Sequence, residues 1–373
     1  MREFNKYVGL DVHKETIAVS VAVGRTGEVR YLGEIGNTAE ALGKLVRQLG
    51  KNGERLSFCY EAGPCGYEVY RQLQGLKQDC MVVAPSLIPR KAGDRVKTDR
   101  RDSLSLARLY RAGELTAVWV PDTEHEALRD LVRAREDMKH LQRQAKQRLL
   151  AFLLRQGKRY DGKSNWTQAH FRWLETVKFA HPVQQIVFQE YIDAVLAGQR
   201  RVHGLDQLIE QAAQRSETWP VTEALMALRG VNLLTAVTIV AEIGDLKRFA
   251  SAPQLMAYLG LVPSEHSSGA SVRRGGITKT GNSHVRRVLI EAAWTYRHAA
   301  RKTATLQRRA ERTPPEVQDI AWAAQKRLCQ RYRLLHAKGK LQVQVCTAVA
   351  RELTGFIWAV GQTVQSGRCT ASV

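Results

Sequence analysis

The sequence predicts an α/β domain, then a long helical segment, and then a mainly helical C-terminal part. Two observations predict this arrangement. Residues 1–120 alternate short runs rich in Val and Ile with stretches of helical periodicity, which is typical of a mixed sheet covered by helices. Residues 124–156 contain neither Gly nor Pro, and this length exceeds that of an ordinary globular helix without a partner.

Strands and helices are expected to follow the order β-β-β-α-β-α-β-α in the N-terminal domain. The strands are expected at residues 7–13, 16–23, 27–36, 56–63 and 80–85, and the helices at 38–51, 66–77 and in the stretch 97–110. A Gly-containing turn after the second strand joins it to the third as in a hairpin. Thr38 can cap the first helix, and Pro85 ends the last strand.

Pro121 closes this first block, and two long helices are expected after it. The first covers 124–156 and carries a partial apolar stripe, made of Leu128, Leu131, Leu141, Leu149, Phe152 and Leu153. A turn at 157–165 and a shorter helix at 166–179 lead to the second, from about Pro182 to Arg215. The stripe favours a helical hairpin or coiled coil that forms a stalk. The stalk is either a simple spacer or an arm that pairs subunits, and we favour the arm.

The C-terminal block, residues 216–373, is expected to be mainly helical. Residues 222–249 read as two helices around Gly230, which can end the first of them in a left-handed conformation. This resembles a helix-hairpin-helix element, whose backbone amides can hold a phosphate. A Gly-, Ser- and Arg-rich loop is expected at 264–283. Helical runs then resume at about 283–310, 314–335 and 343–365.

The charge of the chain indicates its class of partner. The 373 residues are 44% hydrophobic, which suits two or three domains with cores of their own, and the formal net charge is +21. Such an excess favours a phosphate backbone as partner, because neutralising it releases counterions. A basic protein of the membrane surface is the alternative. The sequence shows no apolar run of transmembrane length, no lipidation signal and no secretory signal peptide.

The six cysteines are scattered and form no C-x-x-C pair. Neither a zinc site nor a disulfide scaffold is therefore expected, and the cysteines read as reduced thiols in a cytoplasmic protein.

Four carboxylates are placed where a sheet edge would gather them. Asp11 ends the first expected strand, Glu61 ends the fourth, and Asp99 and Asp102 open a helix. Strand ends and adjacent helix starts meet at one edge of an α/β sheet. Four carboxylates there would repel one another unless cations joined them. Two Mg²⁺ ions about 3.5–4 Å apart can clamp a phosphodiester during its displacement.

The sequence also offers two other interpretations of these acids. A D-x-x-D pair beside arginines is commonly a solvated ion-pair face, but Asp11 and Glu61 stand in apolar strand runs, where an acid without a use is costly. Actin-like ATPases also begin with a strand that ends in Asp, but they need a Gly- and Thr-rich turn after it, and His13 and Lys14 follow here. In the metal interpretation, the neighbouring cations would hold DNA, namely Arg95, Lys97, Arg100 and Arg101.

Four stretches of the chain resemble a known family. They are "YVGLDVHKE", "CYEAGPCGYEVYRQL", "VKTDRRDSLSLARL" and "GLVPSEHSSGASVRRGGITKTGNSHVRRVL". In this order they resemble the DEDD transposases of bacterial insertion sequences, which are bridge-RNA-guided recombinases related to a pilin-gene invertase. The resemblance implies a ribonuclease-H-like catalytic domain, similar to Holliday-junction resolvases, over 1–120, a coiled-coil stalk over 121–215 and a transposase domain over 216–373.

The resemblance also implies a site in two parts. Asp11, Glu61, Asp99 and Asp102 would be the catalytic acids and hold two Mg²⁺ ions. Ser268, five residues after the proline of "GLVP", would attack DNA and form a covalent phosphoserine, with Ser267 and Ser271 as alternatives. The acid site of one subunit would meet the serine loop of another, in a dimer or in a tetrameric synaptic complex. A guide RNA made by the element would pair with donor and target DNA.

Elementary chemistry agrees with a serine nucleophile. A serine ester keeps the energy of the phosphodiester bond, so strands can be exchanged and resealed, whereas attack by water loses it. Serine needs activation, which His266, Lys279 or the acid-bound metal could supply. Phosphate contacts are expected from Arg273, Arg274, Lys279, Arg286 and Arg287.

These observations predict a bacterial, nucleoid-associated transposase that cuts and rejoins donor and target DNA. Two alternatives remain at this point. One is a Mg²⁺-dependent junction endonuclease that uses water instead of Ser268. The other is a nucleic-acid-binding scaffold without catalysis.

Overall fold

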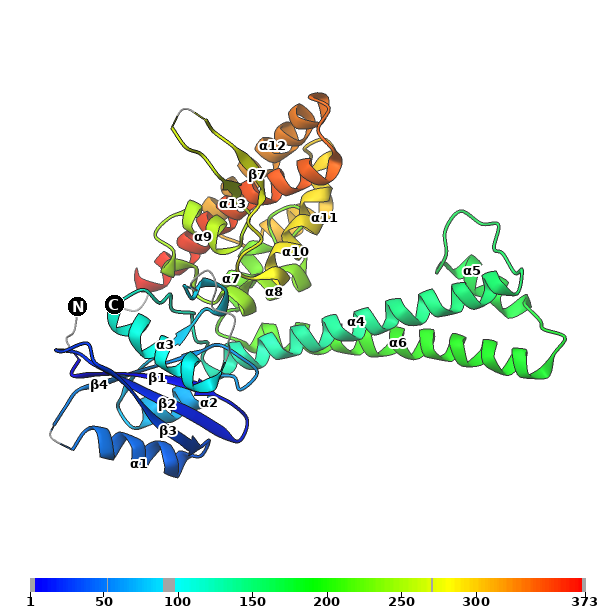
Figure 1. Ribbon diagram of the computed structural model, residues 1–373. Helices are drawn as coiled ribbons and strands as arrows, with labels where there is room; N and C mark the ends of the chain where they lie inside the picture. Colours follow the sequence, from blue (N-terminus) through cyan, green and yellow to red (C-terminus); the bar gives the residue numbers. More distant parts are fainter. Residues whose placement is uncertain (1–3, 52, 90–97, 270, 371–373) are drawn as a thin grey trace. The chain divides into compact units, whose positions relative to one another are not determined.

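The structure is a computed structural model that describes residues 4–51, 53–89, 98–269 and 271–370 (Figure 1). Side chains are described as far as residue 364. The chain folds as two compact units, Met1–Val120 and Pro121–Val373.

The first unit is a five-stranded mixed sheet with helices. Its strands are β1 (Lys6–Val12), β2 (Thr16–Val23), β3 (Val29–Gly36), β4 (Leu56–Glu61) and β5 (Asp79–Val83), in the spatial order β3-β2-β1-β4-β5. Strands β1, β2 and β3 pair antiparallel, whereas β1, β4 and β5 pair parallel. The helices are α1 (Ala39–Leu49), α2 (Glu68–Gly75) and α3 (Asp99–Ala112). The predicted element order and the mixed α/β class are confirmed.

The two faces of this sheet bury different side chains. Val8, Leu10 and Phe58 point toward α1 and α2 and belong to one core with Leu42 and Leu73. The alternate residues of the same strands face α3, because successive side chains on a strand point to opposite faces. Buried Cys59 of β4 packs with Leu106 of α3 on that second face.

A row of small residues lets α3 lie close to the sheet. Ser20, Gly9 and Cys59 stand side by side on β2, β1 and β4, and all three are buried. A Cβ at Gly9 would lie 2.4 Å from the backbone nitrogen of Ala107, so only glycine fits this approach. The hydroxyls of Ser20 and Ser103 share a hydrogen bond of 2.8 Å. Burial raises the pKa of the Cys59 thiol, which therefore packs as a neutral group.

The second unit begins with a helical hairpin. Helices α4 (Thr123–Arg155) and α6 (Pro182–Arg215) run antiparallel and lie side by side, and the short helix α5 (Gln168–Thr176) stands at their far end (Figure 1). Leu149 and Phe152 pack there against Phe188 and Val195. The predicted helical hairpin is confirmed, and we call it the stalk (123–215). That it supercoils as a coiled coil stays a prediction.

The remaining chain is mainly helical and forms the largest core of the described residues. It contains α7 (Trp219–Leu225), α8 (Leu233–Ile243), α9 (Ala252–Tyr258), α10 (Ser283–Ala293), α11 (Ala304–Ala310), α12 (Pro315–Ala337) and α13 (Gln342–Thr370), with 3₁₀ turns at Pro85–Leu87 in the first unit and at Leu246–Arg248 and Trp294–Arg297 here. Gly230 has a φ of +83°, in the left-handed region as predicted, but α7 already ends at Leu225. The intervening residues form turns that bring Gly230 against α10, where a Cβ would lie 2.5 Å from the carbonyl oxygen of Ala292.

The segment expected as a loop at 264–283 contains two short strands that form a β-hairpin. Strand β6 (Pro263–Glu265) pairs antiparallel with β7 (Arg274–Ile277). Its base is tied by close backbone approaches: a Cβ at Gly260 would lie 2.3 Å from the oxygen of Thr280, and one at Gly281 would lie 1.9 Å from that of Tyr258. The prediction of a loop is wrong for these two strands, because their sequences, PSE and RGGI, carry no alternating apolar pattern. We call residues 263–277 the serine hairpin.

Helix α13 is long and apolar enough, over Gln342–Val364, to meet a length and composition test for crossing a membrane. The sequence reading had found no such run. The helix is nevertheless a core element of the second unit, since Val345, Val349 and Leu353 are fully buried in the C-terminal core.

Candidate active site

Asp11 and Glu61 lie at the carboxyl ends of neighbouring parallel strands. Leu10 is in register with Tyr60, so Asp11 and Glu61 are the next residues in step. Asp11 lies two residues after Gly9 and Glu61 lies two residues after Cys59. Both acids therefore lie on the face of the sheet that α3 covers. Both acids are partly exposed.

Helix α3 brings two more acids to this face. Thr98 caps the helix, since its hydroxyl accepts the Arg101 N–H at 3.3 Å. Asp99 is the first helical residue and Asp102 lies about one turn further, so both carboxylates stand in the first turn of α3. The close packing at Gly9 sets the height of α3 over β1, and with it the position of these acids.

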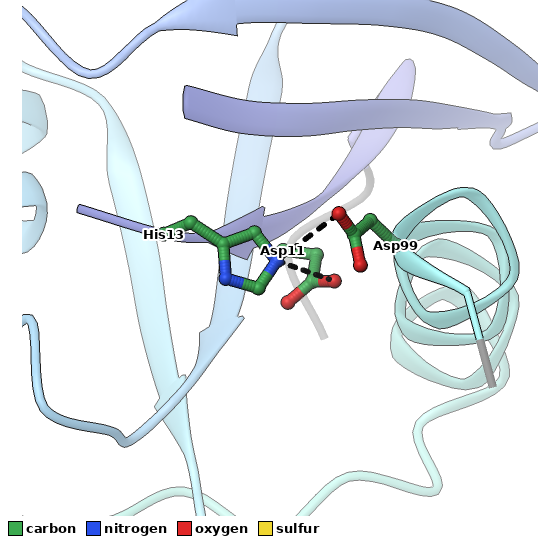
Figure 2. A group of neighbouring side chains, drawn as sticks. All are labelled: Asp11, His13 and Asp99. Carbon is green, nitrogen blue, oxygen red and sulfur yellow. Dashed lines mark ion pairs between the residues drawn. The ribbon is translucent and has the colours of Figure 1, made fainter. Parts of the chain in front are cut away.

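His13 joins the acids of the two elements (Figure 2). Its Nε2 lies 3.4 Å from Oδ2 of Asp11 and 3.4 Å from Oδ2 of Asp99. Its backbone is fixed, because its N–H donates to the Thr16 carbonyl at 2.9 Å and its own carbonyl accepts from Asn37 Nδ2 at 2.8 Å. The Asp11 side chain is 18% exposed, whereas those of His13 and Asp99 are about half exposed, so the cluster is reachable from solvent.

Sequence reasoning missed His13 as a member of the site. In the sequence, His13 serves only to distinguish the chain from an actin-like ATPase. The available signal was spacing, since His13 follows Asp11 by two residues at a strand end, where side chains two apart share a face.

The three side chains fit a divalent metal ion. One ligand atom from each of Asp11, His13 and Asp99 lies within 4.8 Å of the other two. Two carboxylate oxygens and an imidazole nitrogen form a donor set that divalent first-row metals accept. Glu61 and Asp102 stand outside this trio, on the adjacent strand and one turn along α3.

The predicted cations near the acids have mixed placements. Arg100 lies over the ring of Tyr31, with its Cζ 5.4 Å from the ring centroid, and Arg101 is exposed. Arg95 and Lys97 lie outside the described residues.

Ser268 stands at the exposed end of the serine hairpin, in the second unit. Ser268 and Ser271 exchange backbone hydrogen bonds of 3.1 and 3.0 Å, and Gly269 between them has a φ of +54°. The hydroxyl of Ser267 donates to Glu265 Oε1 at 2.8 Å. That of Ser268 has no hydrogen-bond partner among the described residues. The two neighbouring hydroxyls thus differ, since that of Ser267 is engaged with Glu265 and that of Ser268 is exposed.

The predicted cations of the C-terminal unit divide into two groups. Arg273 and Lys279 are exposed, and the Arg274 Nε lies 3.4 Å from Glu265 Oε2. Two others are engaged with the protein itself. Arg286 donates from Nη1 to the carbonyls of Leu259 and Thr280, each at 2.9 Å, and Arg287 pairs with Glu136 and Glu291, each at 2.9 Å.

The sequence matches two family models. Residues 8–156 match a DEDD transposase model, and residues 222–308 match the model of the transposase IS116/IS110/IS902 family. The acid site and the serine hairpin fall in separate matches.

Several named proteins are similar over most of the chain. A Sinorhizobium fredii protein named as a transposase, y4qE, is 50% identical over 95% of this chain and 88% of its own. The transposase for insertion sequence element IS1533 of Leptospira borgpetersenii is 31% identical over 90% of this chain and 97% of its own. The pilin gene-inverting protein of Moraxella bovis is 25% identical over 54% of this chain and 53% of its own.

Proposed function

The chain belongs to the IS116/IS110/IS902 family of transposases and is an insertion-sequence transposase that acts on DNA, and we propose that it cuts and rejoins strands with a carboxylate site in its first unit and Ser268 in its second. In this proposal the first unit is a resolvase-like catalytic domain, the stalk a separate domain, and the rest a serine-bearing domain. The meeting of Asp11, His13 and Asp99 carries the proposal, since these side chains come from two elements 86 residues apart in the chain and converge on one point.

A divalent metal is implied by the match to DEDD transposases, and the donors at the first site fit one. We propose Mg²⁺, with two ions per site, held by Asp11, Asp99, Glu61 and Asp102, with His13 as a further ligand beside Asp11 and Asp99. Bound metal would supply positive charge for the phosphate in the transition state. The Gly9 contact and the Thr98 cap fix where α3 begins over β1, and with it the placement of Asp99 beside Asp11.

Ser268 supplies the nucleophile in this proposal. Its Oγ forms a bond to phosphorus as the bond to the departing strand oxygen breaks, and the serine proton ends on that oxygen. The resulting phosphoserine is attacked by the hydroxyl end of another strand, which restores the phosphodiester and the serine. Arg273, Arg274 and Lys279 on or beside the hairpin would hold phosphates, as would Arg100 and Arg101, and Arg95 and Lys97, near the acids. Arg286 and Arg287 would contribute less, because their guanidinium groups already bind the protein.

The test is strand cleavage and covalent capture on DNA that carries the ends of the element. Asp11→Asn should abolish cleavage and leave DNA binding largely intact, because the acids act in the transition state while basic residues supply affinity. In a trapped reaction of the unaltered protein, peptide mapping should find a DNA end on Ser268. A linkage at Ser267 or Ser271 would move the nucleophile. Full activity of Ser268→Ala, with free ends only, would replace the proposal by a nuclease that uses water.

Two further partners are proposed. A guide RNA would bind through its shape and backbone, and the net charge of +21 suits such contacts. Base pairing by the guide would read the DNA sequence, so the protein would not need a recognition helix for that purpose. RNA that copurifies with the protein should then contain segments that match the flanking DNA, and its absence would argue against a guide. A second copy of the chain would pair through the stalk, so a chain without residues 123–215 should be monomeric by light scattering. A deletion that stays oligomeric would place the interface elsewhere.

A further inference from the structure

A groove in the second unit is lined by Lys279 but by no other residue that has a role in the chemistry proposed above. It has a volume of about 1150 Å³ and lies between the serine hairpin, α9, α12 and α13. Figure 1 shows the hairpin rising beside α12 and α13. The groove exceeds the roughly 300–1,000 Å³ of ordinary small-molecule pockets, which favours an extended ligand.

The wall of the groove is largely apolar. Met256, Leu261 and Ile277 line it together with two aromatic side chains of α13, Phe356 and Trp358. Trp358 is held in place, because its indole N–H donates to the Phe249 carbonyl at 2.9 Å. The aromatic surface is therefore fixed before any ligand arrives.

Cations accompany this apolar wall. Four of the lining residues are cationic, Lys279, Arg327, Arg331 and Arg351, against one acid, Glu352. Glu352 lies 3.0 Å from Nε of Arg327 and 2.9 Å from Nε of Arg331. The carboxylate accepts a hydrogen bond from Nε of Arg327 and forms an ion pair with Arg331, so one acid is shared by two cations. The groove therefore keeps an excess of positive charge.

We propose that this groove binds an unpaired segment of the DNA strand that the enzyme joins. Proteins that hold single strands combine a positively charged groove with aromatic surfaces on which bases stack, and both features are present here. A duplex hides its base faces in its own stack and would gain little from the apolar wall. The inference rests on the proposed function, because it assigns the groove to the DNA strand on which Ser268 acts.

The connection to Ser268 supports a DNA strand as the occupant. The strands of the hairpin form one wall of the groove, and Ser268 lies five residues beyond Pro263, about 16 Å for an extended chain. A strand that leaves the groove along the hairpin would be led toward the serine. An apolar peptide would suit the wall but not the cations.

The test compares two matched pairs of variants of the full-length chain. Val343 lines the groove and Val183 does not; both are the second residue of a long helix, and they are 61% and 58% exposed. Glu is favourable in a first helical turn, so Val343→Glu and Val183→Glu should both fold. Arg351→Ala removes an exposed cation of the groove, and Arg200→Ala removes an exposed one from the stalk.

The measurement is fluorescence anisotropy with a labelled single-stranded DNA of about 20 nucleotides, longer than the usual site size of about 4–16. The same sequence is offered as duplex DNA and as RNA. Val343→Glu and Arg351→Ala should each weaken single-strand binding about tenfold and change duplex binding little. Val183→Glu and Arg200→Ala should behave as the unaltered chain. Equal losses for single strand and duplex, or no loss, would overturn the proposal.

Three other outcomes are also decisive. If the groove residues instead mediate tighter binding of the RNA than of the DNA, the ligand of the groove is RNA and the proposed DNA strand is wrong. A chain that cleaves DNA but binds single strands no better than duplex would contradict the groove alone. A chain that binds single strands through the groove but shows neither cleavage nor a serine linkage would contradict the proposed function alone.

Discussion

The guanidinium of Arg133 in α4 donates hydrogen bonds to both carboxylate oxygens of Glu242 in α8, with distances of 2.7 Å from Nε to Oε1 and 2.9 Å from Nη2 to Oε2. Asn282, which caps α10, donates to the same carboxylate at 2.6 Å. One buried acid thus ties the base of the stalk to the segment that follows the serine hairpin.

Loss of Arg133 should therefore destabilise the second unit. The Glu242 side chain is fully buried and Arg133 is 43% exposed. Arg133→Ala leaves a buried charge with only the amide of Asn282, which should cost about 3 kcal/mol of unfolding free energy. Glu242→Gln leaves an exposed cation and should cost less. Chemical denaturation measures both, with Arg200→Ala as control; the reverse order would contradict the argument.

The contact between Glu136 and α10 should make stability depend on acid pH. Burial acts to raise the pKa of Glu136, but hydrogen bonds from His284 and Arg287 outweigh it, so the pKa lies below its ordinary value of 4.5. The stabilisation is then complete above about pH 4.5 and is lost as the pH falls through the folded-state pKa. Glu136→Gln should flatten the acid limb of a plot of unfolding free energy against pH. An unchanged limb would assign the acid sensitivity to other groups.

Gly9→Ala should displace α3. Its Cβ would meet backbone atoms of Ala107 and Ser103 at 2.4 and 2.5 Å, and these cannot rotate away. A loss of about 1–3 kcal/mol is expected from such overpacking, together with weaker metal binding. Gly36→Ala in β3, whose nearest neighbour would be 3.9 Å away, is the control. A tolerated Gly9→Ala would show that α3 adjusts freely over the sheet.

His13→Ala should weaken Mn²⁺ binding by about tenfold and affect Mg²⁺ less, because an imidazole ligand favours later transition metals over Mg²⁺. Calorimetric titration of the purified protein measures both affinities without any need for catalysis. His203→Ala, at an exposed position of the stalk, should change neither. Equal binding by His13→Ala and the unaltered chain would remove His13 from the ligand set.

Mixed subunits should test whether a site is shared. The acids and Ser268 lie in different units, and α4 between them has 33 residues, about 50 Å of helix. Ser268→Ala and Asp11→Asn should each be inactive alone but recover part of the recombination activity when mixed. Each mixed dimer would then contain one site with both halves intact. Failure to complement would place both halves of the site in one chain.

The sequence predicted most clearly those elements whose information is local. Strand β2 and helix α6 occupy the predicted residues, and Thr38 caps α1 as expected, because periodicity and capping chemistry act within a few residues. The serine hairpin was missed because its strands are three and four residues long and carry no alternating apolar pattern. The ion pair between Arg287 and Glu136 could not be predicted either, because the two residues lie far apart in the sequence. A basic residue that binds DNA and one that holds two helices together look alike in sequence.

The row Ser20, Gly9 and Cys59 also fixes which face of the sheet the acids occupy. Because side chains alternate along a strand, an insertion of one residue between Gly9 and Asp11 would turn the carboxylate toward the core of α1 and α2. The same holds between Cys59 and Glu61. Neighbouring side chains can repack around a substitution in these strands, but they cannot compensate for a change in the number of residues. Functional relatives should therefore have no single insertion or deletion between the positions of Gly9 and Asp11 or between those of Cys59 and Glu61.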